Sequence, residues 1–280
     1  MKQIHWYPGH MKKAQIEVQE RLKLVDVIVE LLDARIPLSS RNDVLYKLTK
    51  DKLRLVVLTK TDLADPKETE KWINFFKNQG FQAVFADLNK PSDVKSIIRS
   101  VEKLGENKNQ KYLDKGMKPQ PIRAMIIGIP NVGKSTLINK MSGRHAASVQ
   151  NKPGHTKSQQ WIKVSNHFEL LDTPGILPPS YEDSKKAVNL ALVGSINAEI
   201  LPNEELAGYA FNYIKENYKH DLLSRFPFLN LDMDTDSCFK EIAVKRGYLT
   251  KGGQDIDKTH KVFLNEVKNG LIGKITFERI

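Results

Sequence analysis

The feature that most constrains this chain is a loop of small residues at 128–136, which reads Gly-Ile-Pro-Asn-Val-Gly-Lys-Ser-Thr. The loop follows an apolar run at 124–127 that predicts a buried strand, and the residues after it are typical of a helix. Its glycines let backbone N–H groups close around phosphate oxygens, while the positive end of the helix faces the anion. Because strand, loop and helix occur in the order that the G-x-x-x-x-G-K-S/T pattern requires, the sequence predicts a phosphate-binding loop.

The polar residues of this loop have separate expected roles. Lys134 reaches the terminal phosphates of a nucleotide, and the hydroxyl of Ser135 ligates Mg²⁺. The other expected nucleotide contacts of the loop are Asn131, Val132, Gly133 and Thr136. A turn of small residues is the alternative interpretation of such a pattern, and the flanking strand and helix disfavour it.

Composition narrows the class of protein. A chain of 280 residues with 40% hydrophobic content forms one large or two medium domains. Its single cysteine, Cys238, excludes an internal disulfide and a zinc site made only of cysteines. The first residues lack an apolar signal region and no apolar run reaches membrane length, so we expect a cytoplasmic protein with no membrane partner.

The net charge of +11 is unevenly distributed. Residues 1–177 carry 30 Lys and Arg against 18 Asp and Glu, whereas residues 178–280 carry 14 against 15. A polyanionic partner that meets the first part of the chain explains this imbalance, and scattered surface lysines explain it equally well.

A second polar motif follows an apolar strand at 53–58. Residues 59–62, Thr-Lys-Thr-Asp, stand at the C-terminal end of this strand, where open α/β sheets bind ligands, and they resemble the guanine-recognition motif N-K-x-D. In that role Asp62 accepts two hydrogen bonds from the guanine ring N–H and amino group, and the stem of Lys60 lies across the base. Thr59 replaces the usual Asn, so a shorter hydroxyl either makes the amide's contact or leaves it unmade.

The next strand, at 81–85, leads to Ala86 and Asp87. They occupy the place where a guanine-binding protein contributes a small-residue loop to the base, although the usual Ser-Ala pair is absent. A helix at 91–104 follows, and the lysine-containing stretch 105–121 predicts either a mobile basic connector or an ordinary solvated linker.

Two later segments supply the expected switches. Residues 153–156, Pro-Gly-His-Thr, fit a first switch whose Thr156 joins the Mg²⁺ shell when the γ-phosphate is present. An apolar strand at 168–171 then leads into Asp-Thr-Pro-Gly, the D-x-x-G motif. There Asp172 holds Mg²⁺ through water, and the backbone N–H of Gly175 senses the γ-phosphate.

The order of these motifs is unusual, because the base-reading residues precede the phosphate loop and ordinarily follow it. Chain termini tolerate relocation when the old ends lie close together, so a circular permutation keeps the same site. The predicted fold class is therefore α/β: a circularly permuted P-loop GTPase domain at 1–178, with a mostly parallel sheet and helices on both faces, and an α-helical C-terminal domain at 179–280. Helical apolar spacings in the second domain occur at 182–196, 204–218, 235–246 and 258–269.

Several motifs together resemble the ribosome biogenesis GTPase A family, whose members are circularly permuted GTPases. Besides the phosphate loop, they are Trp-Tyr-Pro-Gly-His-Met at 6–11, Asp-Ala-Arg-Ile-Pro at 33–37 with Ser-Ser-Arg-Asn at 39–42, and the segments at 153–156 and 172–175. The resemblance covers essentially the whole chain. It implies a GTPase that acts in late assembly of the bacterial large ribosomal subunit, contacts rRNA, and carries a helical C-terminal RNA-binding domain.

We therefore expect Mg²⁺-dependent hydrolysis of GTP to GDP and phosphate, with the nucleotide state timing the binding of rRNA-rich pre-50S particles and no DNA partner. Two alternatives remain at this stage. One is a nucleotide-gated RNA-binding scaffold with negligible turnover, which a phosphate-release assay separates from an enzyme. The other is a GTPase that acts on tRNA or another RNA, which sedimentation with 50S particles distinguishes.

The catalytic group is not the usual glutamine. The position after Gly175, where familiar small GTPases place a water-orienting Gln, is Ile176, whose side chain forms no hydrogen bond. His10, in the segment that the resemblance marks as functional, is the first candidate, His155 is the second, and ordinary packing of either ring is the alternative. The resemblance to cation-dependent relatives implies that Asn131 supplies an oxygen ligand to a bound K⁺, which then takes the part of an arginine finger.

Three sets of site residues summarise these expectations. The catalytic set is His10, Lys134, Thr156 and Gly175. The nucleotide-binding set is Thr59, Lys60, Asp62, Ala86, Asp87, Asn131, Val132, Gly133, Lys134, Ser135, Thr136 and Gly175. The metal-binding set is Ser135, Thr156 and Asp172.

Overall fold

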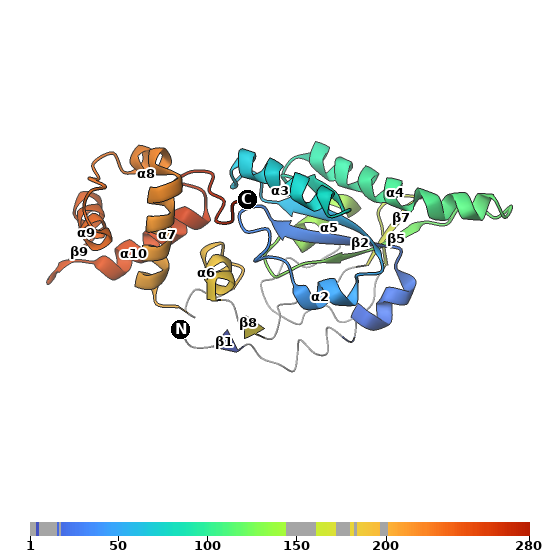
Figure 1. Cartoon of the computed structure of the whole chain (residues 1–280), viewed down its shortest axis with the longest axis horizontal. Coiled ribbons are helices and arrows are strands. Elements are labelled where there is room, and N and C mark those ends of the chain that lie inside the picture. Colours follow the sequence, from blue (N-terminus) through green and yellow to red (C-terminus); the bar gives the residue numbers. More distant parts are fainter. Residues whose placement is uncertain are drawn as a thin grey trace.

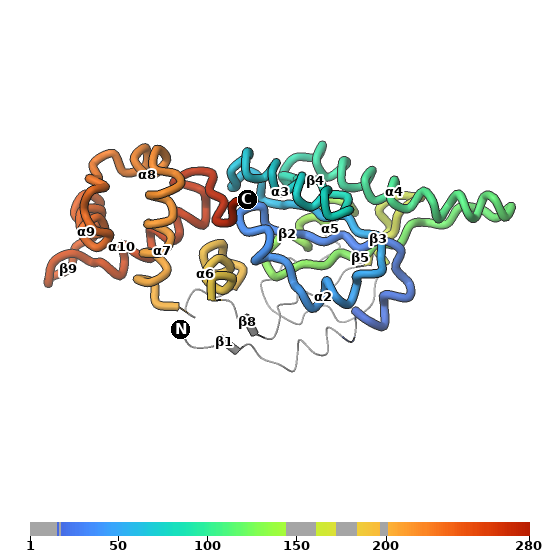
Figure 2. The backbone as a smooth tube through the Cα atoms, in the orientation of Figure 1, coloured from blue at the N-terminus to red at the C-terminus, as the bar shows by residue number. Residues whose placement is uncertain are grey.

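The computed structural model describes residues 16, 18–143, 161–171, 184–196 and 201–280, and the backbone of 4–5 and 180–181. These residues form an α/β body and a group of helices beside it, which Figure 1 shows on the right and on the left. The chain trace in Figure 2 shows that the C-terminus returns from the helices to the α/β body.

A six-stranded sheet lies at the centre of the described α/β body, with strand order β4-β3-β2-β5-β7-β6. Its strands are β2 (Val27–Asp33), β3 (Leu53–Thr59), β4 (Gln82–Phe85), β5 (Ile122–Ile127), β6 (Trp161–Lys163) and β7 (Phe168–Leu171). Neighbouring strands run parallel except β6, which is antiparallel to β7. Every residue of β2 is buried, as expected for a parallel strand covered on both faces.

Helices cover both faces of this sheet, as the sequence predicts. They are α2 (Asp43–Leu48), α3 (Pro66–Asn78), α4 (Pro91–Leu113) and α5 (Lys134–Ser142). Successive side chains of a strand point to opposite faces, so Leu31 packs in the core with α4 and α5, while Leu32 packs in the core with α3. Leu45 of α2 belongs to a third buried hydrophobic cluster, which also contains Ile28 and Met125.

The register of the sheet places two predicted segments side by side. Asp33, the last residue of β2, pairs with Thr59, the last residue of β3. β5 pairs with β2 up to Ile127, directly before the glycine that opens the phosphate loop. The C-terminal ends of these central strands therefore meet at one edge, although their motifs are far apart in the sequence.

The predicted connector at 105–121 is wrong over its first part, because α4 continues to Leu113. Gly105 does not break the helix: a Cβ atom added there would overlap the buried side chain of Ile122. The glycine therefore serves the close approach of α4 to β5. The far end of α4 projects beyond the sheet (Figure 1). Lys111 is exposed in its last turn, and Lys115 is exposed in the turn that follows Leu113.

The C-terminal part of the chain is helical, as predicted. Its helices are α6 (Ser184–Leu192), α7 (Asn203–Asn217), α8 (Lys219–Arg225), α9 (Thr235–Arg246) and α10 (Ile256–Lys268). The four predicted helices correspond to α6, α7, α9 and α10, whereas the short α8 was not predicted. The predicted domain boundary between 178 and 179 falls outside the described residues, so this division remains a prediction.

Short elements complete the described chain. They are the 3-10 helix η1 (Leu22–Leu24), the pair β1 (Ile4–His5) with β8 (Ser180–Tyr181), and the pair β9 (Leu249–Thr250) with β10 (Gly253–Gln254). Both pairs are antiparallel. Among the described helices, none combines the length and apolar character needed to cross a membrane.

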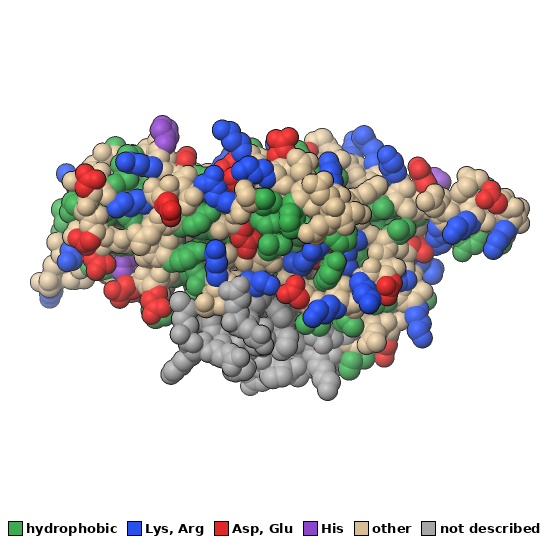
Figure 3. Space-filling model, in the orientation of Figure 1, with side chains coloured by type: hydrophobic (Ala, Val, Ile, Leu, Met, Phe, Trp, Pro, Cys, Tyr) green, Lys and Arg blue, Asp and Glu red, His purple; other side chains and the backbone are tan. Residues whose placement is uncertain are grey.

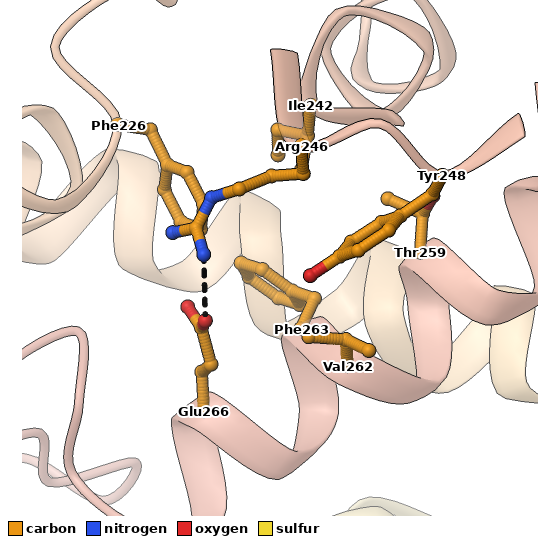
Figure 4. Close-up of a pocket in the computed structure, with 8 residues that line it drawn as sticks. All are labelled: Phe226, Ile242, Arg246, Tyr248, Thr259, Val262, Phe263 and Glu266. Atoms are coloured by element: carbon orange, nitrogen blue, oxygen red, sulfur yellow. Dashed lines mark hydrogen bonds and ion pairs between the residues drawn. The ribbon is translucent and has the colours of Figure 1, made fainter. Parts of the chain in front are cut away.

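Aromatic packing and one shared carboxylate hold the C-terminal helices together. Phe263 of α10 lies within 6 Å of the ring centres of Phe211 and Phe239. Glu266 of α10 accepts ion pairs from Arg225 at 2.6 Å and from Arg246 at 3.4 Å, so one side chain joins α8, α9 and α10. Figure 4 shows Arg246 reaching from α9 across the ring of Phe226 to Glu266.

Two glycines in helix interiors allow a matched stability test. Gly105→Ala should lower the free energy of unfolding by about 1–3 kcal/mol, because the added methyl group overlaps Ile122 in a closed core. The Cβ atom added by Gly208→Ala in α7 has no packing partner within 4 Å. This substitution should therefore raise the free energy of unfolding by about 0.5–1 kcal/mol. Urea unfolding of both variants measures the difference, and equal effects of the same sign would contradict a packing role for Gly105.

Candidate functional site

The phosphate loop, residues 128–133, connects β5 directly to α5. Gly128 (φ 156°) lies against the carbonyl oxygen of Leu31, which an added Cβ atom would approach to 2.8 Å. Gly133 (φ 107°) caps α5, and a Cβ atom there would come within 2.8 Å of Leu88. Both backbone conformations favour glycine, so these two positions explain the spacing of the glycines in the motif.

The side chain of Lys134 folds back over the phosphate loop. Its Nζ donates hydrogen bonds to the carbonyl oxygens of Gly128 at 3.0 Å and Ile129 at 2.6 Å, and the residue is 8% exposed. The ammonium group therefore lies against the loop at the N-terminal end of α5, where the helix dipole also favours an anion. Ser135 and Thr136 follow in the first turn of this helix.

Thr59 joins the two halves of the site. Its hydroxyl oxygen lies 2.8 Å from the carbonyl oxygen of Val132 in the phosphate loop and 3.1 Å from that of Leu32 in β2. A hydroxyl has one proton, so it donates to one of these oxygens at a time. The shorter side chain of Thr59 therefore contacts the phosphate loop directly.

A buried cluster of charges holds Lys60. The carboxylate of Asp33 accepts hydrogen bonds from Nε of Arg35 at 3.0 Å and from its Nη2 at 2.8 Å, and Nζ of Lys60 lies 3.5 Å away. Burial favours the neutral acid, but the Arg35 guanidinium and Lys60 hold the pKa of Asp33 below its usual range. Burial also lowers the pKa of Lys60, which Asp33 opposes.

Residues 59–65, called the guanine loop after the role predicted for them, form a tight turn between β3 and α3. Lys60 has a φ of 57°, and its carbonyl oxygen accepts a hydrogen bond from the backbone N–H of Leu63 at 3.0 Å. Asp65 ends the loop by capping α3 through its carboxylate. Asp62 is exposed between these fixed ends, so its carboxylate is accessible to a ligand.

Ala86 and Asp87 lie at the end of the neighbouring strand, β4. The backbone N–H of Ala86 donates to the carbonyl oxygen of Leu58 at 2.8 Å, which places this segment beside the guanine loop. The carboxylate of Asp87 accepts a hydrogen bond from the N–H of Asn89 at 2.9 Å and so shapes the turn itself. The next residue, Leu88, reaches the phosphate loop at Gly133.

The described residues thus contain one part of the predicted site. The structure brings together the guanine loop, the segment at 86–87 and the phosphate loop. Outside the described residues lie His10, His155, Thr156, Asp172, Gly175 and Ile176. Asn131 has a φ of 61°, and its Nδ2 donates to the carbonyl oxygen of Gly194 at 2.9 Å.

Asp33 and Arg35 had no role in the sequence-based site. The available signal was an acidic residue at the end of a fully buried strand, followed two positions later by an arginine. A buried carboxylate needs a partner, and Arg35 supplies it within the same turn. This local signal does not reveal the third member of the cluster, Lys60, because that residue follows the next strand, β3.

Known proteins match the chain over nearly its whole length. The family model described as 50S ribosome-binding GTPase matches residues 123–210. Ribosome biogenesis GTPase A of Bacillus cereus is 44% identical over 276 residues, which cover 98% of this chain and 93% of that protein. The chain belongs to the ribosome biogenesis GTPase A family. Members are GTPases, and the predictions of GTP hydrolysis and a guanine nucleotide ligand are confirmed at this level.

Solved structures of the family agree with the fold. GNP-bound YlqF from T. maritima has a TM-score of 0.69 and 31% identity to this chain, covering 95% of this chain and 98% of that one. A GDP-bound structure of TM YlqF has the same TM-score, 30% identity, and covers 94% and 98%. The predicted fold class, an α/β P-loop GTPase domain followed by helices, is therefore confirmed.

The buried charge cluster gives a pH-dependent prediction. Asp33→Asn should lower the free energy of unfolding at pH 7 by about 3–5 kcal/mol, because it leaves the buried Arg35 guanidinium without a counter-charge. The folded pKa of Asp33 is depressed, so its stabilisation is present above the unfolded pKa of about 3.9 and is lost as the pH falls through the lower folded value. The difference in free energy of unfolding between the parent and Asp33→Asn should therefore become smaller only below about pH 4.

Urea unfolding between pH 3 and pH 8 measures this difference. Asp43→Asn is the control, because Asp43 forms an ion pair with Lys186 on the surface and is 60% exposed. It should change the free energy of unfolding by less than about 1 kcal/mol. A deficit for Asp33→Asn that stays constant down to pH 3 would show that the ion pair is not its cause.

Proposed function

We propose that this chain is a GTP-hydrolysing assembly factor for the bacterial large ribosomal subunit, which works in the cytoplasm and binds rRNA-rich pre-50S particles according to its nucleotide state. The observation that carries the proposal is the bond from the Thr59 hydroxyl to the carbonyl oxygen of Val132. It joins a base-reading loop to a phosphate loop despite their reversed order in the chain. The names of the relatives and the family model support the ribosomal partner.

In this proposal the base is read by the guanine loop. Asp62 accepts hydrogen bonds from the guanine N–H groups, and the stem of Lys60 lies across the base. The exposure of Asp62 and the fixed position of Lys60 beside Asp33 support these roles. Ala86 and Asp87 also contact the base in this proposal. The hydrogen bond from Ala86 to the end of β3, which places them beside the guanine loop, supports this role.

The phosphates bind at residues 131–136, with Lys134 on the terminal groups. A bound Mg²⁺ would supply positive charge that offsets the negative charge developing on the phosphates during hydrolysis. Ser135 would ligate it together with Thr156 and Asp172, and Gly175 would sense the γ-phosphate. Ser135 fits this role, because it offers a hard hydroxyl oxygen in the first turn of α5, directly after Lys134.

We assign the orientation of the attacking water to His10, with His155 as the second candidate, because Ile176 has no hydrogen-bonding side chain. Asn131 is the proposed ligand of a K⁺ ion. Its amide nitrogen donates to the carbonyl oxygen of Gly194, and its amide oxygen is the atom that would ligate the ion. Turnover should then require K⁺ in place of an arginine finger.

Guanine preference tests the base-reading role. Asp62→Ala should weaken GTP binding by on the order of 2–3 kcal/mol, roughly 30- to 150-fold, because two charge-assisted hydrogen bonds are lost. Asp51→Ala, an exposed carboxylate before β3, should leave the affinity unchanged. Titration calorimetry with GTP and ATP measures both, and equal affinities of the parent for the two nucleotides would refute the assignment.

Co-sedimentation with 50S particles tests the partner. Figure 3 shows Lys and Arg side chains spread over the α/β body and the helices on the face in view. Binding should therefore fall steeply with salt and be stronger with a GTP analogue than with GDP. Reversing two exposed charges of the helical part, with Lys245→Glu and Lys251→Glu, should weaken binding more than Lys77→Glu on α3.

Association with tRNA but not with 50S particles would instead support the tRNA alternative.

Turnover in the presence of 50S particles tests the catalytic assignment. Steady-state GTP turnover is measured for the parent, His10→Ala and His155→Ala, in K⁺ and in Na⁺. The variant that has lost the water-orienting ring should turn over GTP more slowly than the parent. Unchanged rates for both variants would exclude the histidines, and equal parent rates in the two salts would exclude the cation.

A further inference from the structure

The last residues of the chain lie on the guanine loop. We define the C-terminal tail as residues 274–280, which follow α10 without regular secondary structure. The backbone N–H of Ile275 donates to the carbonyl oxygen of Leu63 at 3.1 Å, and the hydroxyl of Thr276 accepts from the backbone N–H of Asp65 at 3.1 Å. The tail is thus bonded to the guanine loop on the C-terminal side of Asp62.

The same tail is bonded to the helical part of the chain. The carbonyl oxygen of Thr276 accepts hydrogen bonds from the hydroxyl groups of Tyr213 at 2.9 Å and Tyr218 at 3.2 Å. Burial raises the pKa of Tyr218 to about 12, so its phenol stays protonated and donates at neutral pH. Phe277 is buried, with its ring centre 5.2 Å from that of Tyr213. The tail therefore connects α7 to the guanine loop.

A second set of bonds joins the tail to the loop after β2. The backbone N–H of Phe277 donates to the carbonyl oxygen of Arg35 at 2.8 Å. The carboxylate of Glu278 accepts from the backbone N–H groups of Leu38 at 2.6 Å and Ser39 at 2.9 Å. Because Arg35 also holds Asp33, the partner of Lys60, the tail supports the guanine loop from its N-terminal side as well.

The packing around Leu63 leaves little space. Gly270, with a φ of 69°, lies so close that an added Cβ atom would come within 2.9 Å of the Leu63 side chain. Leu63 is the residue after Asp62, so movement of the tail displaces the carboxylate that reads the base. A hydrogen bond to the guanine ring needs a distance of about 2.7–3.2 Å between the donor and acceptor heavy atoms, so small displacements of the carboxylate weaken it.

From these contacts we infer that the C-terminal tail positions the guanine loop, so that the helical part of the chain sets the affinity for the guanine base. This inference rests on the proposed base-reading role of Asp62. Residues 275–278 are positioning residues: their part is to keep Asp62 and Lys60 in the arrangement that binds the base. A chain that populates this arrangement less often binds GDP more weakly in proportion.

A double-mutant cycle separates positioning from a general effect on folding. Ile275→Pro removes the N–H that bonds to Leu63, and should weaken GDP binding about tenfold, as for one lost hydrogen bond of ordinary strength. In an Asp62→Ala background the same change should weaken it less than about twofold, because no base contact remains to be positioned. Titration calorimetry with Mg-GDP on the full chain gives affinity and binding-competent fraction separately.

A conservative variant covers the case in which Ile275→Pro does not fold. Thr276→Val keeps the backbone and volume but loses the hydroxyl that accepts from Asp65, so it should show a smaller weakening with the same dependence on Asp62. Thr235→Val is its control, because it loses a hydroxyl bond to Asn212 within the helical part, away from the tail. It should bind GDP as the parent does.

Two failures are distinguishable. If Asp62→Ala binds GDP as tightly as the parent, the proposed base-reading role is wrong and the inference falls with it. If Asp62→Ala is impaired but the tail variants weaken binding equally in both backgrounds, or not at all, only the positioning role is overturned. A cycle in which the tail variants matter only when Asp62 is present supports it.

Discussion

A buried ion pair, between Asp33 at the end of β2 and Arg35 two residues later, is the contact on which the site and its surroundings depend. Asp33 also holds Lys60, and Arg35 donates to the carbonyl oxygens of Lys268 at 2.8 Å and Val193 at 3.4 Å, near the ends of α10 and α6. Buried charges are costly unless every partner is in place. The bonds of Asp33 and Arg35 therefore hold the sheet, the guanine loop and the helices together, because loss of one partner leaves a buried charge without its counter-charge.

The reversed order of the motifs has a simple structural consequence. A site at the edge of a parallel sheet depends on which strands are neighbours, and the register aligns Asp33 with Thr59 whatever their order in the chain. The helical part follows the permuted domain in the chain. The C-terminal tail then returns from the helices to the guanine loop. The guanine loop is thus held between a hydroxyl bond to the phosphate loop at Thr59 and backbone bonds to the tail at Leu63.

Local patterns predicted β3, β4, β5 and β7, the phosphate loop and four of the C-terminal helices, because apolar periodicity and glycine spacing are properties of neighbouring residues. Gly105 was misinterpreted because its cause, the side chain of Ile122, lies on the next strand. The final residues of the chain contact segments that lie far away in the sequence. Their contacts with Leu63 and Arg35 join segments more than two hundred residues apart, and no local pattern encodes such a pairing.

Hydrogen exchange on the full chain tests most directly whether nucleotide, guanine loop and tail form one cooperative unit. GDP should slow exchange of the amides of Ile275 and Phe277 as well as that of Leu63, because binding stabilises the arrangement that all three share. Neither tail amide is among the proposed nucleotide contacts. Protection confined to the phosphate loop, with the amides of Ile275 and Phe277 exchanging at the same rate with and without GDP, would contradict the account.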